Sequence, residues 1–285
     1  MTLNPHPSGV DVERSIRPMT SQGLWALHLA AATWWAVAIV GHLLFAAYIL
    51  GTYGKATLHH DAAAWNRVWP AGYLAVQPLG NVIVAIHVLL ASVVSVCGPL
   101  QLLPDVRRRL PWFHRWNGRV YITTAIIVGL AGLAMLAIDR GFTGASQNGN
   151  VAFNGFLMLI CATLAWRHAR ARDFAAHRRW ALRLLVLAAG VWFFRIGLAT
   201  WIALNDGIVG FDPRTMQGPA LWVLACGEWL VPLTVLEAYF RAEKARTNTS
   251  RYAVAALLLL SALVTGYGIY RACIGMWLPA LHGNT

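Results

Sequence analysis

Long apolar runs separated by short polar segments follow one another along this chain. About seven of them approach the roughly 20 apolar residues that an α-helix needs to cross a bilayer core about 30 Å thick. We place these runs at 25–50, 79–103, 112–138, 151–166, 180–204, 220–240 and 252–278. The pattern predicts an all-α integral membrane protein, a bundle of about seven transmembrane helices.

The composition agrees with a membrane location. Hydrophobic residues make up 58% of the chain and charged residues 12%, and the mean hydropathy is +0.54, values far from those of soluble domains. We expect 1–23, which lacks a cleavage-site pattern, to be a disordered cytoplasmic tail and not a signal peptide. Residues 24–285 then form a single transmembrane domain. Within it, 51–78 is expected to be an outer loop that Trp65, Trp69 and Tyr73 anchor at the membrane interface.

Basic residues gather in alternate loops. The segments before the first run and after the second, fourth and sixth runs hold most of the 23 Lys and Arg residues. Short loops rich in these residues stay on the cytoplasmic side, so we expect a cytoplasmic N-terminus and a C-terminus outside. The net charge of +12 then favours anionic lipid headgroups as partners. It does not favour nucleic acid, because the basic residues are spread over helix ends and no soluble domain presents them.

Histidines lie at two levels of the predicted bundle. His114 and His177 each stand at the start of an outward-running helix, whereas His42 and His87 lie toward the outer ends of the first and second helices. Two imidazoles that face each other at one depth can ligate a haem iron. The sequence therefore raises the hypothesis of one haem b on His114 and His177 and another on His42 and His87. Small residues beside His87 favour close helix packing over a groove for a cofactor.

Four arginines accompany the inner histidines, namely Arg115, Arg119, Arg178 and Arg183. Guanidinium groups bind carboxylates and phosphates, so this cluster could hold haem propionates, an anionic substrate or lipid headgroups. The same pattern of His, Arg and Trp is typical of an interfacial cluster that contacts lipid phosphates.

Two charges fall near mid-membrane, Arg195 on the fifth run and Glu228 on the sixth. An unpaired charge at that depth costs about 2.5 to 3.5 kcal/mol on insertion scales, so we expect the two to pair. By the same depth argument, Glu237 should meet Arg183 or Arg119 near the cytoplasmic surface.

Several motifs together resemble a known family. They are His87 with Gly98-Pro99-Leu100-Gln101, His114-Arg115-Trp116-Asn117-Gly118-Arg119-Val120-Tyr121, His177-Arg178-Arg179-Trp180 with Arg183, Arg195, and the segment 229–237. Over about 81–240 the chain resembles the bacterial membrane proteins grouped as domain-of-unknown-function family 2306. The resemblance implies a multi-pass protein of the bacterial inner membrane and no particular activity, and His42 lies outside it.

The layout of the histidines is also similar, more distantly, to that of b-type diheme membrane cytochromes. In those proteins two histidines on one helix are sometimes separated by 14 residues, which is the spacing of His28 and His42. Gln101 stands at that spacing after His87, and neither His114 nor His177 has a second histidine there. The similarity is therefore one of layout and not of motif.

These observations lead to three hypotheses. The first is a haem-b-binding protein that moves electrons between a quinol or another redox protein and an acceptor on the cytoplasmic side. The second is a transporter or membrane enzyme for an anionic, lipid-like substrate held by the His/Arg cluster. The third is a non-catalytic subunit of a membrane complex. Because no nucleophile-base motif and no phosphate loop is present, the sequence leaves open whether the protein is an enzyme.

Overall fold

A computed structural model describes residues 9–69, 72–140 and 145–282, of which 9–21 and 145–146 are described by their backbone alone. The long helices are α1 (Gly9–Ile49), α3 (Pro78–Leu102), α5 (Pro111–Ala137), α6 (Ala145–Arg170), α7 (Phe174–Ala188), α8 (Gly190–Leu204), α9 (Pro219–Lys244) and α10 (Asn248–Ala272). The short ones are η1 (Leu50–Gly54), α2 (Lys55–Leu58), η2 (Ala62–Arg67), α4 (Pro104–Arg109), η3 (Cys273–Trp277) and α11 (Leu278–Leu281). In these ranges the only β-pairing is an isolated bridge between Asp212 and Gln217, which confirms the predicted all-α class.

Six helical segments of the described chain are long and apolar enough to cross a membrane. They are Gln22–Leu58, Pro78–Leu102, Pro111–Ala137, Gln147–Arg170, Pro219–Lys244 and Asn248–Leu281. Helices α7 and α8 meet at 48° around Ala189 and together make a seventh span if this bent pair is counted as one. The bundle of about seven helices is thereby confirmed, while the orientation of its termini stays a prediction.

Prolines set the starts of several helices. Pro78, Pro104, Pro111 and Pro219 stand in the first turns of α3, α4, α5 and α9, where the missing N–H costs nothing and the fixed φ suits a helix. The chain therefore turns sharply from α3 through α4 into α5. This turn brings the arginine-rich segment 107–119 to the end of the bundle.

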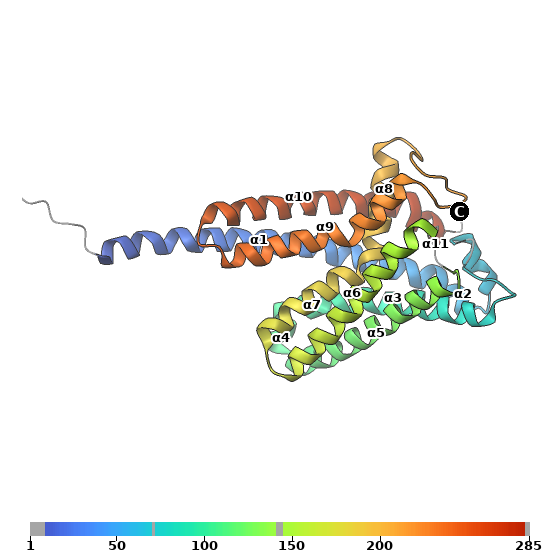
Figure 1. Cartoon of the computed structure of the whole chain (residues 1–285), viewed down its shortest axis with the longest axis horizontal. Coiled ribbons are helices and arrows are strands. Elements are labelled where there is room, and N and C mark those ends of the chain that lie inside the picture. Colours follow the sequence, from blue (N-terminus) through green and yellow to red (C-terminus); the bar gives the residue numbers. More distant parts are fainter. Residues whose placement is uncertain (1–8, 70–71, 141–144, 283–285) are drawn as a thin grey trace, which may run out of the picture.

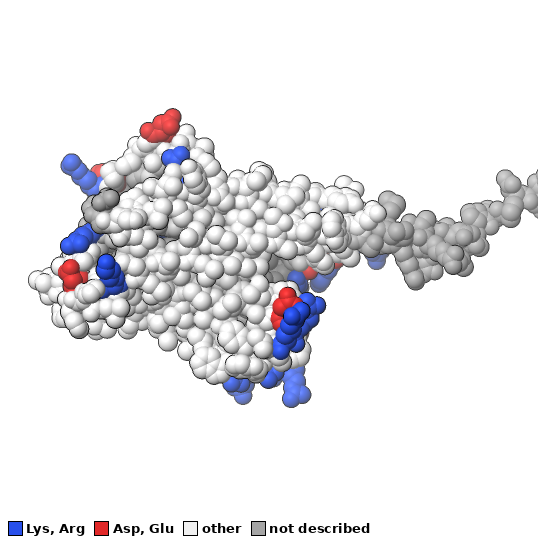
Figure 2. Space-filling view, turned by 180° about the vertical axis from the view of Figure 1, so that it is seen from behind, with Lys and Arg blue, Asp and Glu red and all other residues white. Residues whose placement is uncertain are grey.

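The helices form two groups that diverge toward the arginine-rich end (Figure 1). In one group, α1 packs along α10, with α9 beside them; in the other, α3 packs on α5, α5 on α6 and α6 on α7. Helix α8 joins the groups, because it continues from α7 and packs against α9 and α10. Figure 2 shows charged side chains near the two ends and a broad band between them without charged groups, as a bilayer requires.

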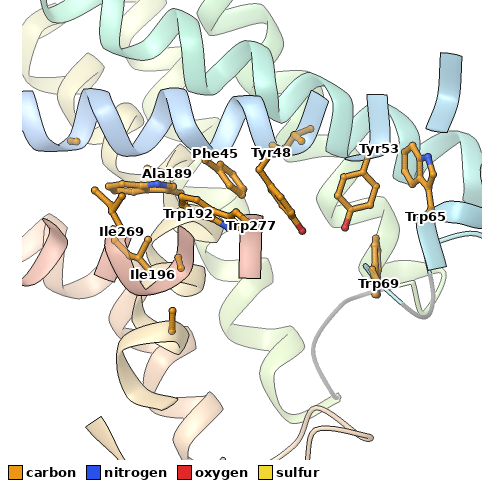
Figure 3. Packing of buried hydrophobic residues seen from close by; sticks show 14 of the residues in the cluster. Phe45, Tyr48, Tyr53, Trp65, Trp69, Ala189, Trp192, Ile196, Ile269 and Trp277 are labelled. Carbon is orange, nitrogen blue, oxygen red and sulfur yellow. The ribbon is translucent and has the colours of Figure 1, made fainter. Parts of the chain in front are cut away.

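The structure differs from two expectations about the segments before and after the first span. Helix α1 begins at Gly9, within the segment that we expected to be a disordered tail, and residues 1–8 lie outside the described part. Two of the expected interfacial anchors, Trp65 and Trp69, are only 5% and 7% exposed. Trp65 meets the edge of Tyr53 with ring centroids 4.9 Å apart, and both indoles belong to the aromatic core cluster in Figure 3. The interface prediction was wrong for them, because α1 continues through η1 and α2 and carries the following segment back over the bundle.

A buried arginine holds the same end together. Arg140, 1% exposed, donates to Gln77 Oε1 and Asn81 Oδ1 at 3.2 Å and to the carbonyl of Gly72 at 3.3 Å. These bonds connect the end of α5 to the start of α3 and to the segment before it. His59, His60 and Asp61 are exposed, and no group of three metal-ligating side chains occurs in the described ranges.

Candidate functional site

A large cavity of about 1770 Å³ lies between the two helix groups. Its walls come from α1 and from α3 to α10, and most of the lining residues are apolar. Along α9 it extends from Val223 to Tyr239, which at 1.5 Å per residue is about 24 Å. It is therefore long enough for an aliphatic chain and larger than most pockets for small molecules.

Polar groups gather at the arginine-rich end of this cavity. His114 from α5 and His177 from α7 both line it. Arg115, directly after His114, and Arg119, about one turn further along α5, line it as well. Arg178 lines the cavity too, so the structure brings together the inner histidines and three of the four predicted arginines.

The two imidazoles differ in their hydrogen bonding. The His177 Nδ1 lies 2.9 Å from the carbonyl of Ala165 on α6. Because a carbonyl only accepts, Nδ1 carries the hydrogen and Nε2 of the neutral ring keeps its lone pair. The buried Nδ1 of His114 has no hydrogen-bond partner among the described residues.

The first turns of α5 are fastened to α3 by two side chains that the sequence analysis did not single out for a role. Gln101 Nε2 donates to the carbonyl of His114 at 3.1 Å, and Asn117 Nδ2 donates to the carbonyl of Cys97 at 2.9 Å. A Cβ at Gly118 would lie 3.3 Å from Gln101 Oε1. The two motifs that carry the family resemblance in this region therefore pack on each other and fix the position of His114.

Two arginines of the predicted cluster, Arg178 and Arg183, are paired with carboxylates. Arg178 makes a bidentate pair with Glu243 at 3.0 and 2.9 Å, and Arg183 Nε lies 2.6 Å from Glu237 Oε1. The predicted contact between Glu237 and Arg183 is thus confirmed, and both pairs connect α7 to α9. For Arg115 and Arg119, in contrast, the described ranges supply no carboxylate within ion-pair distance, so their charges remain available at the cavity.

The outer histidines do not form the expected facing pair. His42 is 6% exposed and stacks on Trp192 of α8 with ring centroids 4.3 Å apart. The His87 Nδ1 instead lies 2.9 Å from the carbonyl of Val128 on α5. Because α1 and α3 turn these side chains toward different helices, no ring contact joins them in the described structure, and neither lines the cavity.

The expected pair of Arg195 and Glu228 is not formed either. Arg195 Nη1 donates to the Tyr48 hydroxyl at 3.5 Å, and its guanidinium lies over the Phe45 ring. Glu228 lies beside Gly190, whose Cβ would be 3.3 Å from its Oε1. Gly190 and Arg195 are five residues apart on α8, a rotation of about 140°. The two charges therefore share a depth but contact nearly opposite faces of one helix.

This fold defines a multi-pass helical membrane protein. The family described as "Predicted membrane protein (DUF2306)" matches residues 84–240, which is more than half of the 285 residues. The chain belongs to this family. No match was found among curated proteins or among solved structures, so the layout similarity to diheme cytochromes stays a prediction.

Proposed function

We propose that the cavity binds an amphiphile with an anionic head group, which the protein transports or modifies within the bacterial inner membrane. The main support for this proposal is the shape of the cavity. One continuous cavity joins long apolar walls to an end where Arg115, Arg119, His114 and His177 gather. Apolar walls bind an aliphatic chain through the hydrophobic effect, and guanidinium groups without a protein counter-ion bind phosphate, carboxylate or sulfonate.

The division of the arginines also supports this proposal. Arg178 and Arg183 contact carboxylates of α9 and thereby hold the two helix groups together at the cavity's edge. Arg115 and Arg119 stand on the exposed side of α5 at the cavity lining. In this proposal Arg178 and Arg183 maintain the shape of the cavity, and Arg115 and Arg119 contact the head group.

Binding of an alkyl sulfonate to the protein in nanodiscs tests the proposal, because its head group stays ionised over the usual pH range. Arg119→Gln should weaken binding by about tenfold, the lower end expected for loss of one charge-assisted hydrogen bond at a partly exposed site. The matched control is Arg109→Gln, since Arg109 lies at the same end, pairs with Asp105 at 3.6 Å and does not line the cavity.

Methanesulfonate, the same head group without a chain, provides the second control. It should bind far more weakly, since each buried methylene contributes about 0.8 kcal/mol. Equal affinity of the wild type, Arg119→Gln and Arg109→Gln for the alkyl sulfonate would contradict the proposal. Equal affinity for the two sulfonates would instead indicate a site for small free anions.

A second candidate is a single haem b at the inner level, and the hydrogen bond between His177 and Ala165 supports it. Metal-ligating histidines typically donate one ring N–H to a backbone carbonyl and offer the other nitrogen. His114 and His177 would hold the iron, with Arg115 and Arg119 at the propionates, and the haem would supply one-electron transfer. The packing of His42 on Trp192 gives no comparable support for an outer haem.

Absorbance of the purified protein, made with sufficient haem, separates the two candidates. The haem candidate requires Soret and α bands that respond to dithionite and disappear in His114→Ala and His177→Ala but persist in His42→Ala. A colourless, folded wild type would eliminate it and leave the amphiphile proposal unchanged.

A further inference from the structure

Glu228 is a buried carboxyl that lines the cavity at the break between α7 and α8. Its residue is 8% exposed. Its Oε1 would lie 3.3 Å from a Cβ at Gly190, the first residue of α8, and Asn154 Nδ2 of α6 would lie 2.8 Å from the same point. Three helices therefore meet around this carboxyl, where the pair of α7 and α8 bends.

The groups around Glu228 are amides and backbone carbonyls. On α6, the Asn150 amide donates to the carbonyl of Ala225, and its oxygen accepts from Trp229 Nε1 at 3.1 Å. One turn further, Asn154 Nδ2 donates to the carbonyl of Leu187 at 3.4 Å. The buried Asn154 Oδ1 has no donor among the described residues. It is therefore an acceptor to which a protonated carboxyl could donate a hydrogen bond.

Charged groups face away from this carboxyl or are already paired. Arg195 projects from the opposite side of α8. Arg183 of α7 pairs with Glu237, which lies nine residues and about 13 Å beyond Glu228 along α9. The Cys226 thiol is the nearby titratable group on α9 itself. Within the described ranges no cation lies at ion-pair distance from Glu228, so its ionised form depends on water that enters the cavity.

We propose that Glu228 is a proton-binding site coupled to filling of the cavity, an inference that rests on the proposed function. When an aliphatic chain occupies the cavity, it displaces water from the carboxylate. The Glu228 carboxylate then takes one proton from bulk water and becomes a carboxylic acid, whose O–H can donate to Asn154 Oδ1. An anion bound at the arginine-rich end is thus accompanied by a proton bound at the bend.

Reciprocity between the two ligands gives the first test. Alkyl sulfonate binding to the protein in weakly buffered nanodiscs is followed with a soluble pH indicator. The wild type should take up more protons per bound sulfonate than Glu228→Gln, and its affinity should rise more steeply as the pH falls. The residues at the arginine-rich end are the same in both proteins, so the difference in proton uptake reports on Glu228 alone. Identical proton uptake by the two proteins would overturn the inference.

Infrared difference spectroscopy keeps this test separate from that of the proposed function. At neutral pH the sulfonate should increase a carboxylic-acid C=O band that is absent in Glu228→Gln and retained in Glu237→Gln. If Glu228→Gln does not fold, Glu228→Asp should shift the same band.

Failure of each proposal has its own signature. Normal sulfonate binding without a Glu228 band would overturn the proton site alone. A Glu228 acid band at neutral pH in a protein that binds no sulfonate would overturn the proposed ligand and retain the proton site.

Discussion

Gly190 permits the close meeting of three helices at the bend, and its replacement by alanine gives a sharp prediction. The new Cβ would lie 2.8 Å from Asn154 Nδ2 and 3.3 Å from Glu228 Oε1. The Asn154 amide is the movable end of its side chain, but moving it breaks its bond to the carbonyl of Leu187. Overpacking costs about 1 to 3 kcal/mol and the lost bond about 1, against a gain of up to about 1 from replacing glycine in a helix. We expect Gly190→Ala to lower the free energy of unfolding by about 1 to 3 kcal/mol.

Unfolding in mixed detergent and SDS micelles, followed by tryptophan fluorescence, measures this change. Gly149→Ala on α6 is the matched control, because a Cβ there meets nothing within 4 Å and should leave the stability unchanged or slightly raised. Asn154→Ala should partly rescue Gly190→Ala, since it removes the nearest atom. Equal stability of the Gly190→Ala and Gly149→Ala variants would refute the close approach of α6, α8 and α9.

Three further outcomes test other contacts by the same unfolding assay or by proteolysis. Arg183→Ala and Glu237→Ala should show a coupling energy of about 0.5 to 3 kcal/mol, because the pair is 2.6 Å apart with side chains 17% and 33% exposed; simply additive losses would argue against the ion pair. Trp65→Ala should cost about 3 to 5 kcal/mol, whereas Trp116→Ala, at a residue 63% exposed, should cost under about 1 kcal/mol; similar losses would place Trp65 at the surface. Arg140→Met should speed protease cleavage within 72–77, because it removes the bonds to Gly72, Gln77 and Asn81; an unchanged cleavage rate would show that these bonds do not hold the segment.

The sequence was sufficient for the helical spans because each crossing must be apolar over a fixed length, whatever its neighbours are. The bend in the run 180–204 could not be predicted in this way, since apolar residues continue on both sides of Ala189. Gly190 is the local signal, but its meaning depends on Asn154 and Glu228 from other helices. Trp65 was misplaced for a related reason, because an indole suits a membrane interface and a buried aromatic cluster equally well.

Within the candidate site, the sequence predicted those contacts that depend only on the depth of the two residues in the membrane. Arg183 and Glu237 both lie near one membrane surface, where long side chains of adjacent helices reach each other, and their pairing followed. Depth did not suffice for Arg195 and Glu228 or for His42 and His87, because a contact also requires the two side chains to face each other around their helix axes. That rotation is set by packing, as the stacking of His42 on Trp192 illustrates.

Photolabelling tests the central claim most directly, namely that the cavity between the helix groups binds an anionic amphiphile by its chain and head. An alkyl sulfonate with a photoreactive group in the chain is crosslinked to the protein in nanodiscs, and the labelled residues are mapped. The account predicts labels on cavity residues such as Val231, Val235 and Ser261, competed by unlabelled sulfonate and reduced in Arg119→Gln. Labelling that falls equally on the exposed Leu263 and is unaffected by competitor would contradict it.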